Sequence, residues 1–407
     1  MVHARKPSTL KEPAHNLLEF IMEKLRPSLL ALGLLCSATA HATSWLSTQL
    51  VYQPEGWGQG QVYGLNNAGQ VIGVISPPPP PFPGMIDTLP MAFVTGANGS
   101  HLRPIDPNYQ PYVDHCAGGC HTHSTPRAIN DSGQIAISSF TPWSMELGVS
   151  LAGPGGGTLA PPPGTAGAFG VNLSLNNSGQ LAGTYYGPTL SFATGANGSN
   201  PQALGMLDQS YDSWVHSIND NGQLLVNGVP AGSSASRTFV TGANATGIAF
   251  EVGSFGYQSW ATGLNNSAQL FGGYRISAGG EERAFITGAN GTGFTDIGSL
   301  GGPTFANAIS NTGLVVGTSG GTPFVYGYKG NGMQDLNQLI ALAPGEFFTE
   351  APDINDRGQI IAESNLGKMY LLSPVPEPTT YAMFAGGLAL LVWRARNRPH
   401  VSRETPA

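Results

Sequence analysis

The residues best suited to chemistry lie in one short segment, His115 to His123, which reads HCAGGCHTH. The chain has three cysteines, and Cys36 falls within an apolar N-terminal run. That run is predicted below to be part of a cleaved signal peptide, so Cys116 and Cys120 are the two cysteines of the mature chain. In an oxidising compartment, such a pair is expected to form a disulfide that closes a small surface loop.

Two alternatives to the disulfide use the same segment. Thiolate and imidazole are good ligands for zinc or copper, so a metal site is the first alternative. Its ligands would be His115, Cys116, Cys120, His121 and His123. Haem attachment is the second, but it uses C-x-x-C-H, and the spacing here is one residue longer. The favoured prediction is a disulfide, with no cofactor.

Two sequence motifs of known enzymes, H-E-x-x-H and the P-loop, do not occur in the chain. Asp114, Asp208, Asp212 and Glu251 cannot be paired from sequence into the two facing carboxylates of a glycosidase. Charged residues make up only 10% of the 407 residues, and the net charge is −7. Since phosphate binding needs clustered cations, this composition argues against a nucleic-acid partner.

A motif of the form Asn-Asn/Asp-x-Gly-Gln recurs through the region between the two ends of the chain and divides it into repeats. The first residues of its seven copies are Asn66, Asn130, Asn176, Asn219, Asn265, Ser310 and Asn355. The intervals are 64, 46, 43, 46, 45 and 45 residues. The first interval is longer because of an insertion near residues 77–123, which also contains the Pro77 to Pro81 run.

The composition of the motif predicts a tight β-hairpin. Asn or Asp caps such a turn through its side chain, and Gly supplies a positive φ. Ala268 takes the place of that Gly in the fifth copy, so we expect strain there. A second element follows, a strand whose Phe is expected to point inwards, and then another turn. Its copies begin at Phe93, Phe192, Phe239 and Phe285, and their Asn-x-Ser/Thr triplets are explained by turn chemistry.

Four short strands in about 45 residues match the size of one β-propeller blade. The fold class is therefore predicted as all-β, with seven blades, and a β-solenoid is the alternative. The last copy ends at its third strand, residues 369–372. Residues 45–50 are expected to supply the missing fourth strand and so to remove an open sheet edge.

The pattern resembles the HAF family of extracellular repeats over roughly residues 60–372. In that family an Ile-Asn-Asp-x-Gly-Gln turn and a Phe strand alternate with an Asp-Leu-Gly-x-Leu-Gly-Gly segment. The His that precedes the Phe in the family is replaced here by Ala92, Ser191, Thr238 and Ala284. The resemblance implies an extracellular repeat protein and transfers no catalytic residue.

The N-terminus has the three parts of a secretory signal. Lys24 and Arg26 precede an apolar run from Leu29 to Leu35, and Ala40-His41-Ala42 is an A-x-A cleavage site. Residues 1–42 are thus predicted as a signal peptide with cleavage after Ala42, and translation is expected to start at Met22. The β-repeat domain then covers residues 43–372.

The C-terminus, residues 373–407, has the order of a membrane sorting signal. Val375-Pro376-Glu377-Pro378 precedes an uncharged apolar run, residues 381–393, and then Arg394, Arg396 and Arg398. The arginines would keep the end of the chain in the cytoplasm. The prolines would keep the Pro-Glu-Pro segment out of a helix. This arrangement resembles the PEP-CTERM signal processed by exosortases, which implies a membrane peptidase as partner and a transient membrane anchor.

These observations predict a protein that is exported across the inner membrane and is located at the cell surface, in the outer envelope or, once secreted, in the extracellular matrix. The favoured function is non-enzymatic, structural or binding, in an exopolysaccharide or biofilm context. Trp214, Trp260 and Tyr211 are candidates for stacking on sugars, although aromatic residues of a repeat often belong to its core. The alternatives are a propeller enzyme that acts on polysaccharide and an extracellular metal-binding protein.

Overall fold

The computed structural model describes most of the body of the chain. The described residues are 45–375 except 52–56, 58, 79–86, 89, 107–111, 114–122, 142–145, 157, 160–169, 187–189, 205–209, 231–236 and 254, together with 386–387 and 389–390. The predicted signal peptide and most of the predicted sorting signal lie outside this set.

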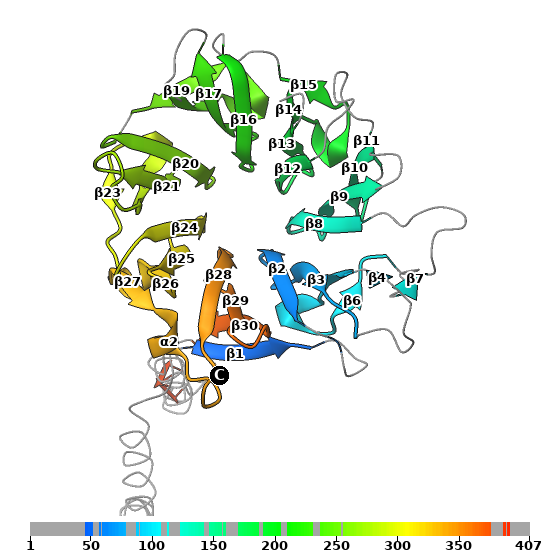
Figure 1. Cartoon of the computed structure of the whole chain (residues 1–407), viewed down its shortest axis with the longest axis vertical. Coiled ribbons are helices and arrows are strands. Elements are labelled where there is room, and N and C mark those ends of the chain that lie inside the picture. The colour runs from blue at the N-terminus through cyan, green and yellow to red at the C-terminus, as the bar shows by residue number, and fades with distance from the viewer. Residues whose placement is uncertain are drawn as a thin grey trace, which may run out of the picture. The chain divides into compact units, whose positions relative to one another are not determined.

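Seven four-stranded antiparallel sheets form the ring of a β-propeller (Figure 1). Blades one to three, from the inner strand outwards, are β2 (Gly60–Leu65), β3 (Val71–Ile75), β5 (Met91–Val94) and β6 (Arg103–Pro104); β8 (His123–Ile129), β9 (Ile135–Thr141), β10 (Glu146–Ala152) and β11 (Thr158–Leu159); and β12 (Gly170–Leu175), β13 (Leu181–Tyr186), β14 (Leu190–Ala193) and β15 (Gln202–Ala203).

Blades four to six follow the same order. They are β16 (Ser210–Ile218), β17 (Leu224–Pro230), β18 (Arg237–Thr241) and β19 (Ile248–Val252); β20 (Gln258–Leu264), β21 (Leu270–Arg275), β22 (Arg283–Ile286) and β23 (Thr295–Asp296); and β24 (Thr304–Ile309), β25 (Val315–Ser319), β26 (Thr322–Tyr326) and β27 (Met333–Asp335). A short helix, α2 (Leu336–Leu339), leads from blade six to blade seven.

The seventh blade joins the two ends of the body. It contains β28 (Phe348–Ile354), β29 (Ile360–Ser364) and β30 (Met369–Pro374), and its outer strand is β1 (Trp45–Leu50). The register pairs Trp45 with Pro374 and Leu50 with Met369. This pairing confirms the predicted closure by residues 45–50, and the closed ring excludes the solenoid alternative.

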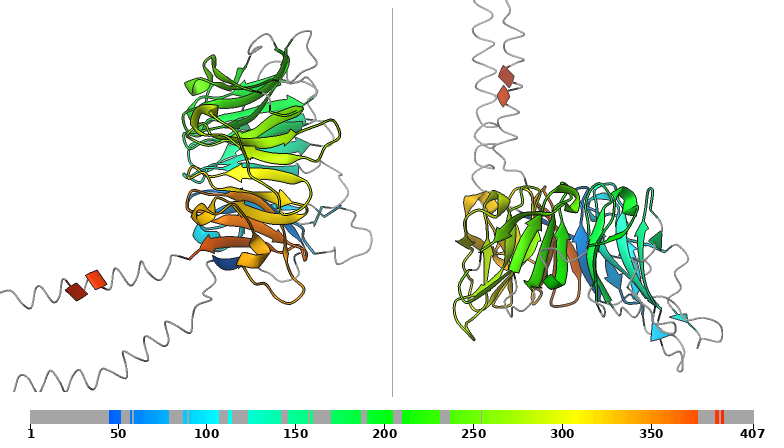
Figure 2. Two further views of the ribbon diagram at one scale, coloured as in Figure 1. Left: turned by 90° about the vertical axis from the view of Figure 1, so that its left-hand side faces the viewer. Right: turned by 90° about the horizontal axis from the view of Figure 1, so that it is seen from above.

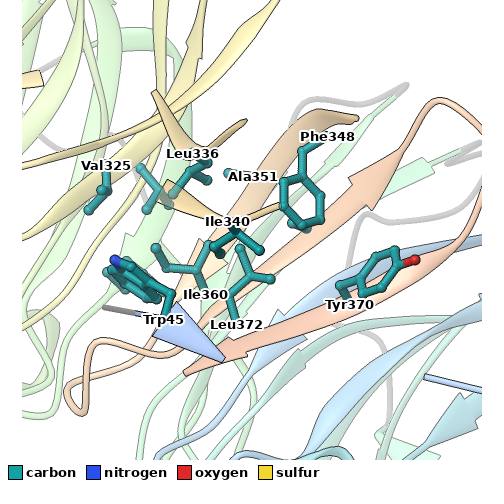
Figure 3. Close-up of a cluster of buried hydrophobic side chains, with 12 residues drawn as sticks. Trp45, Val325, Leu336, Ile340, Phe348, Ala351, Ile360, Tyr370 and Leu372 are labelled. Carbon is teal, nitrogen blue, oxygen red and sulfur yellow. The ribbon is translucent and has the colours of Figure 1, made fainter. Parts of the chain in front are cut away.

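Hydrophobic residues of adjacent blades share core clusters, so the blades are packed face to face. The inward Phe is fully buried in each copy of the second element, as predicted: Phe93, Phe192, Phe239 and Phe285 are at most 1% exposed. One cluster joins blades six and seven around Trp45, Phe348 and Leu372 (Figure 3). Another joins blades seven and one through Leu371 and Phe93.

The strands of each blade alternate in direction, so the turns that join them lie at two opposite ends of the blade. Equivalent turns of all blades lie at the same end of the propeller (Figure 2). The repeated Asn-Asn/Asp-x-Gly-Gln turns join first to second strands at one end, which we name the belt end for the residues described below. The loops that join second to third strands lie at the far end. The first interval of the repeat includes a two-stranded sheet of β4 (Asp87–Thr88) and β7 (Tyr112–Val113).

The two repeated turns of a blade hold each other at the belt end. In blade one, the Asn98 N–H donates to the carbonyl of Ala68, and the Thr95 hydroxyl accepts from the Val71 N–H at 2.9 Å. The same contacts recur in blades three, four and five. Asn98, Asn197, Asn244 and Asn290 all have φ between 51 and 54°. Their Asn-x-Ser/Thr triplets are thus turn residues, as predicted.

The turn glycines are held in left-handed backbone, with Gly222 at φ 70° and Gly313 at φ 83°. Ala268 adopts φ 50° at the same place in the fifth copy, which is the unfavourable conformation that the sequence predicted. A Cβ at Gly222 would lie 2.9 Å from the Asn244 nitrogen, whereas a Cβ at Gly313 has its nearest neighbour at 3.6 Å.

Substitution of these two glycines should therefore have unequal effects. Gly313→Ala is expected to cost about 1 kcal/mol, the penalty of left-handed backbone alone. Gly222→Ala adds a backbone clash and is expected to cost about 2–3 kcal/mol. Denaturant unfolding of the two variants measures the difference. Equal losses in both would show that the close approach of the two turns is relaxed without cost.

Candidate functional site

One side chain from each blade forms a closed belt around the propeller axis. The belt residues, the second of each repeated turn, are Asn67, Asp131, Asn177, Asp220, Asn266, Asn311 and Asp356. The backbone N–H of each donates to the side-chain Oδ1 of the next, over 2.7–2.9 Å. The last bond, from the Asp356 N–H to Asn67, joins blade seven to blade one.

Carboxylates and carboxamides alternate around most of the belt. Asn67 donates its Nδ2 to Oδ2 of both Asp131 and Asp356, each at 3.0 Å. Asn177 bridges Asp131 and Asp220 in the same way. Seven is an odd number, so strict alternation is impossible and one pair of like neighbours must occur. That pair is Asn266 and Asn311, which are uncharged, so no two carboxylates are adjacent.

A second layer of amides lies directly beneath the belt and is buried. The first Asn of each repeated turn donates its Nδ2 to the backbone carbonyl of the equivalent residue in the next blade. Asn66, for example, reaches Asn130 at 2.9 Å, and Asn355 reaches Asn66 at 2.9 Å. Ser310 replaces Asn in blade six and turns its hydroxyl to Thr312 instead.

These turns surround a cavity of about 220 Å³ at the belt end of the axis. Its polar groups are already committed, since both oxygens of Asp131 and of Asp356 accept hydrogen bonds within the belt. Among the described residues, no group of three or more His, Cys, Asp or Glu could hold a metal ion. The belt therefore links all seven blades through one continuous set of hydrogen bonds.

A second set of side chains, on the inner strands, differs from the belt because it contains aromatic as well as polar residues. The set consists of the inner-strand residues that pair with the fourth residue of each second strand: Gln61, Thr125, Asn172, Trp214, Trp260, Phe305 and Glu350. We call it the inner row. Its aromatic members occupy three consecutive blades, four to six, and its polar members occupy the others. All seven side chains are partly or fully exposed.

β-Bulges interrupt the register of five inner strands close to this row. One extra residue is inserted at Tyr63, Arg127, His216, Thr262 and Asn307. Such bulges commonly direct side chains at functional sites. His216 pairs through its Nε2 with the Asn227 amide at 2.9 Å, and burial lowers the pKa of this imidazole.

Three acidic residues line the seam between blades seven and one. Glu350 lies opposite Glu363 in the register of β28 and β29. Burial raises the pKa of Glu363, and the charge of Glu350 adds to this rise, although Glu363 also accepts from the Val62 N–H at 2.8 Å. Asp353 accepts from the N–H groups of Leu65 and Ile354 at 2.9 and 2.8 Å. Glu363 and Asp353 therefore connect β2 of blade one to blade seven by hydrogen bonds.

Burial raises the pKa of Asp353 from 3.8 to about 7, so stability should depend on pH. Between these two pH values the folded state holds a proton that the unfolded state has already lost. The contribution of Asp353 to stability is therefore fully present below pH 3.8 and is lost as the pH rises through about 7. The slope is at most about 1.4 kcal/mol per pH unit. In Asp353→Asn this slope should flatten, and one N–H loses its acceptor, at about 1–2 kcal/mol. Urea unfolding at several pH values checks this, and an unchanged slope would contradict it.

The Cys/His segment cannot be placed in this frame. Residues 114–122 lie outside the described residues, and only the backbone of His123 is described, at the start of β8. The disulfide therefore stays a prediction, tested by native mass spectrometry: loss of two hydrogens supports it, and an added metal or haem mass contradicts it.

Of the predicted aromatic candidates, Trp214 and Trp260 fall in the inner row, and the Tyr211 side chain lies outside the described residues. Phe305, Glu350 and Glu363 were missed by sequence reasoning. Glu350 and Glu363 are 13 positions apart, and no spacing signal joins them. Only the register of the paired strands brings these two residues together.

Val375 is the one described residue of the predicted Val-Pro-Glu-Pro segment, and its side chain is exposed. Pro376, Glu377, Pro378, Arg394 and Arg396 lie outside the described residues, as do Ala40 and Ala42. Within the described part of the chain, no helix is long and apolar enough to cross a membrane.

Comparison with known proteins matches residues 374–397 to the PEP-CTERM protein-sorting motif. No curated protein matches the chain. Among solved structures, YCF48 from Cyanidioschyzon merolae is 11% identical with a TM-score of 0.49, covering 81% of this chain and 99% of that one. An inactive virginiamycin B lyase from Staphylococcus aureus is 12% identical with a TM-score of 0.47, covering 81% and 100%. Neither similarity assigns a function.

Proposed function

We propose that this exported chain, which carries a PEP-CTERM signal recognised by exosortase, delivers a non-catalytic propeller that binds a neutral polysaccharide at the cell surface or in the extracellular matrix. Residues 381–393 hold the precursor in the membrane until exosortase processes the Pro376-Glu377-Pro378 segment. The mature product is then the seven-bladed body.

The inner row carries this proposal. Trp214, Trp260 and Phe305 occur at one register position of three consecutive inner strands, and Phe305 is 45% exposed. Gln61, Thr125 and Asn172 occupy the same position elsewhere around the axis, and Glu350 is the one charged member of the row. Apolar faces combined with a few polar groups are the usual lining of a site for a hydroxyl-rich ligand.

Trp260 is held in place by its surroundings. Its ring lies against Gly273, where an added Cβ would approach the indole Cζ2 to 2.6 Å. The Arg275 guanidinium lies 5.8 Å from the centre of the same ring and forms an ion pair with Glu282 at 3.4 Å. A side chain fixed in this way loses little conformational entropy when a ligand binds, which supports a binding role.

Glycan-array binding followed by titration of the best ligand tests the proposal. The double variant Trp260→Ala, Phe305→Ala is expected to bind about tenfold more weakly, since each aromatic contact contributes about 0.5–1.5 kcal/mol. Tyr257→Ala is the matched control, because Tyr257 is 67% exposed and lies outside the inner row. Equal affinity of the double variant and wild type would sink the assignment to the inner row.

The pair of Glu350 and Glu363 favours a second candidate, an enzyme that acts on polysaccharide. Two neighbouring carboxyl groups, one with a raised pKa, are the groups that glycoside hydrolysis uses. Glu350→Gln and Glu363→Gln separate the two functions. If wild type turns over a polysaccharide and either variant loses that turnover while keeping the fold, the enzymatic function replaces the binding one.

A further inference from the structure

The strand that leads into the sorting signal ends at the belt end. β30 pairs with β29 so that Leu372 faces Ile360, the first residue after the belt turn of blade seven. Pro374 lies two residues beyond, paired with Trp45 at the start of β1. A Cβ at Gly358, in that turn, would be 3.6 Å from Pro374 Cγ. Both ends of the body therefore leave the propeller at one place on the belt end.

The tether from this place to the predicted membrane segment is short. Six residues, 375–380, separate Pro374 from Tyr381. Even fully extended, this stretch covers at most ~25 Å. An inner strand of seven residues such as β28 alone spans ~20 Å. To bring the far end to the membrane, the tether would have to run back along the whole length of the closing blade.

Basic and aromatic side chains surround the exit. Tyr328 contacts Trp45 with ring centres 4.9 Å apart, and Lys329 Nζ lies 5.5 Å from the centre of the Tyr328 ring. Arg357, in the belt turn of blade seven, is exposed and makes no ion pair with the described residues. Tyrosine with Lys or Arg is the combination found at the polar surface of membranes.

The cations of the far end are arranged differently. Arg237 pairs with Glu251, Arg283 with Asp296 at 2.8 Å, and Lys368 with Glu346 at 2.7 Å. Their charges are balanced within the blades. The exit region of the belt end therefore differs from the far end in presenting Arg357 without a carboxylate partner among the described residues. The three carboxylates of the belt also lie at this end, where they accept hydrogen bonds within the belt.

We propose that the belt end faces the membrane in the anchored precursor, with Tyr328, Lys329 and Arg357 against anionic phospholipid headgroups. The far end, where the loops of residues 76–90 and 105–122 join their strands, then points away from the lipid. This inference rests on the proposed anchoring by residues 381–393 and adds the orientation of the propeller to it.

Depth-dependent fluorescence quenching in vesicles tests the orientation on the full chain. The native cysteines are replaced by serine, and one probe site is introduced: Asn331→Cys, exposed in the belt-end turn of blade six, or Leu366→Cys, 51% exposed in the far-end turn of blade seven. The vesicles contain phosphatidylethanolamine and phosphatidylglycerol with a headgroup-linked quencher. We expect quenching several-fold stronger at position 331 than at position 366.

A charge variant tests the role of the cations. Lys329→Gln combined with Arg357→Gln should bring the two quenching signals towards equality, because each cation near an anionic surface favours contact by roughly fivefold. Vesicles of phosphatidylcholine should do the same to the unaltered chain.

The contradicting outcomes are distinguishable. A chain that stays in the supernatant when vesicles are sedimented overturns both the anchoring and the orientation. A chain that sediments with quenching equal at both positions, stronger at position 366, or missing from both overturns the orientation and leaves the anchoring intact.

Discussion

Replacement of Trp45 by alanine is expected to lower the free energy of unfolding by about 3–5 kcal/mol, the range for removal of a large buried aromatic side chain. Trp45 is 2% exposed and lies in the core cluster shared by blades six and seven (Figure 3). It also begins the strand that closes the ring. Removal of the Trp45 side chain should leave a cavity in this core and weaken the pairing of the outer strand of blade seven. Thermal or denaturant unfolding measures the loss of stability.

Trp45→Phe is the matched control. Among the described residues, the Trp45 indole Nε1 is buried and has no hydrogen-bond partner. Phenylalanine removes that unsatisfied donor, which offsets part of the lost apolar contact. We expect a loss of less than about 1.5 kcal/mol for Trp45→Phe. If Trp45→Ala were equally mild, closure of the ring through β1 would contribute little to stability.

Asn67→Asp is expected to destabilise the propeller by about 2–4 kcal/mol at neutral pH. The substitution keeps the Oδ1 acceptor for the Asp356 N–H but removes both Nδ2 donors. It also places three carboxylates in succession, because the new carboxyl group at position 67 lies between Asp356 and Asp131. Repulsion raises the pKa of the new carboxyl group, so the deficit should shrink as the pH falls through its folded-state value.

Asn311→Asp provides the graded comparison for the belt. Asn311 donates its Nδ2 to Asp356 alone and has the uncharged Asn266 on its other side. One lost donor and one new like-charge neighbour should cost about half as much as Asn67→Asp. Urea unfolding at about pH 4 and about pH 7, on either side of the ordinary carboxyl titration range, measures both variants. Equal losses would contradict the alternation of charge as the reason for the sequence of the belt.

Local chemistry was readable from the sequence because it depends on neighbouring residues. The Asn-Asn/Asp-x-Gly-Gln turn and the inward Phe each act within one hairpin, and both were predicted. The number of blades followed from seven copies of one period, and ring closure followed from the unpaired strand at each end. The PEP-CTERM tail was readable for the same reason, since its signal is the order of a few adjacent residues.

The belt, the inner row and the acidic seam were decided only by the tertiary structure. Asn67 and Asp356 are 289 positions apart and meet only when the ring closes. Which side chains lie at one level of the inner strands depends on the β-bulges, and bulges leave no signal in the repeat period. Likewise, Glu350 faces Glu363 because of register across a hairpin with two irregularities.

The exit of the tail at the belt end belongs to the same class. The sequence determined that the chain ends in a sorting signal, because such a signal is a linear string. It could not determine which face of the propeller the signal leaves, since that depends on how β30 pairs with β1 and β29. Sequence therefore determined the repeats and the sorting signal, and the closed ring decided which side chains meet and at which end of the propeller β30 finishes.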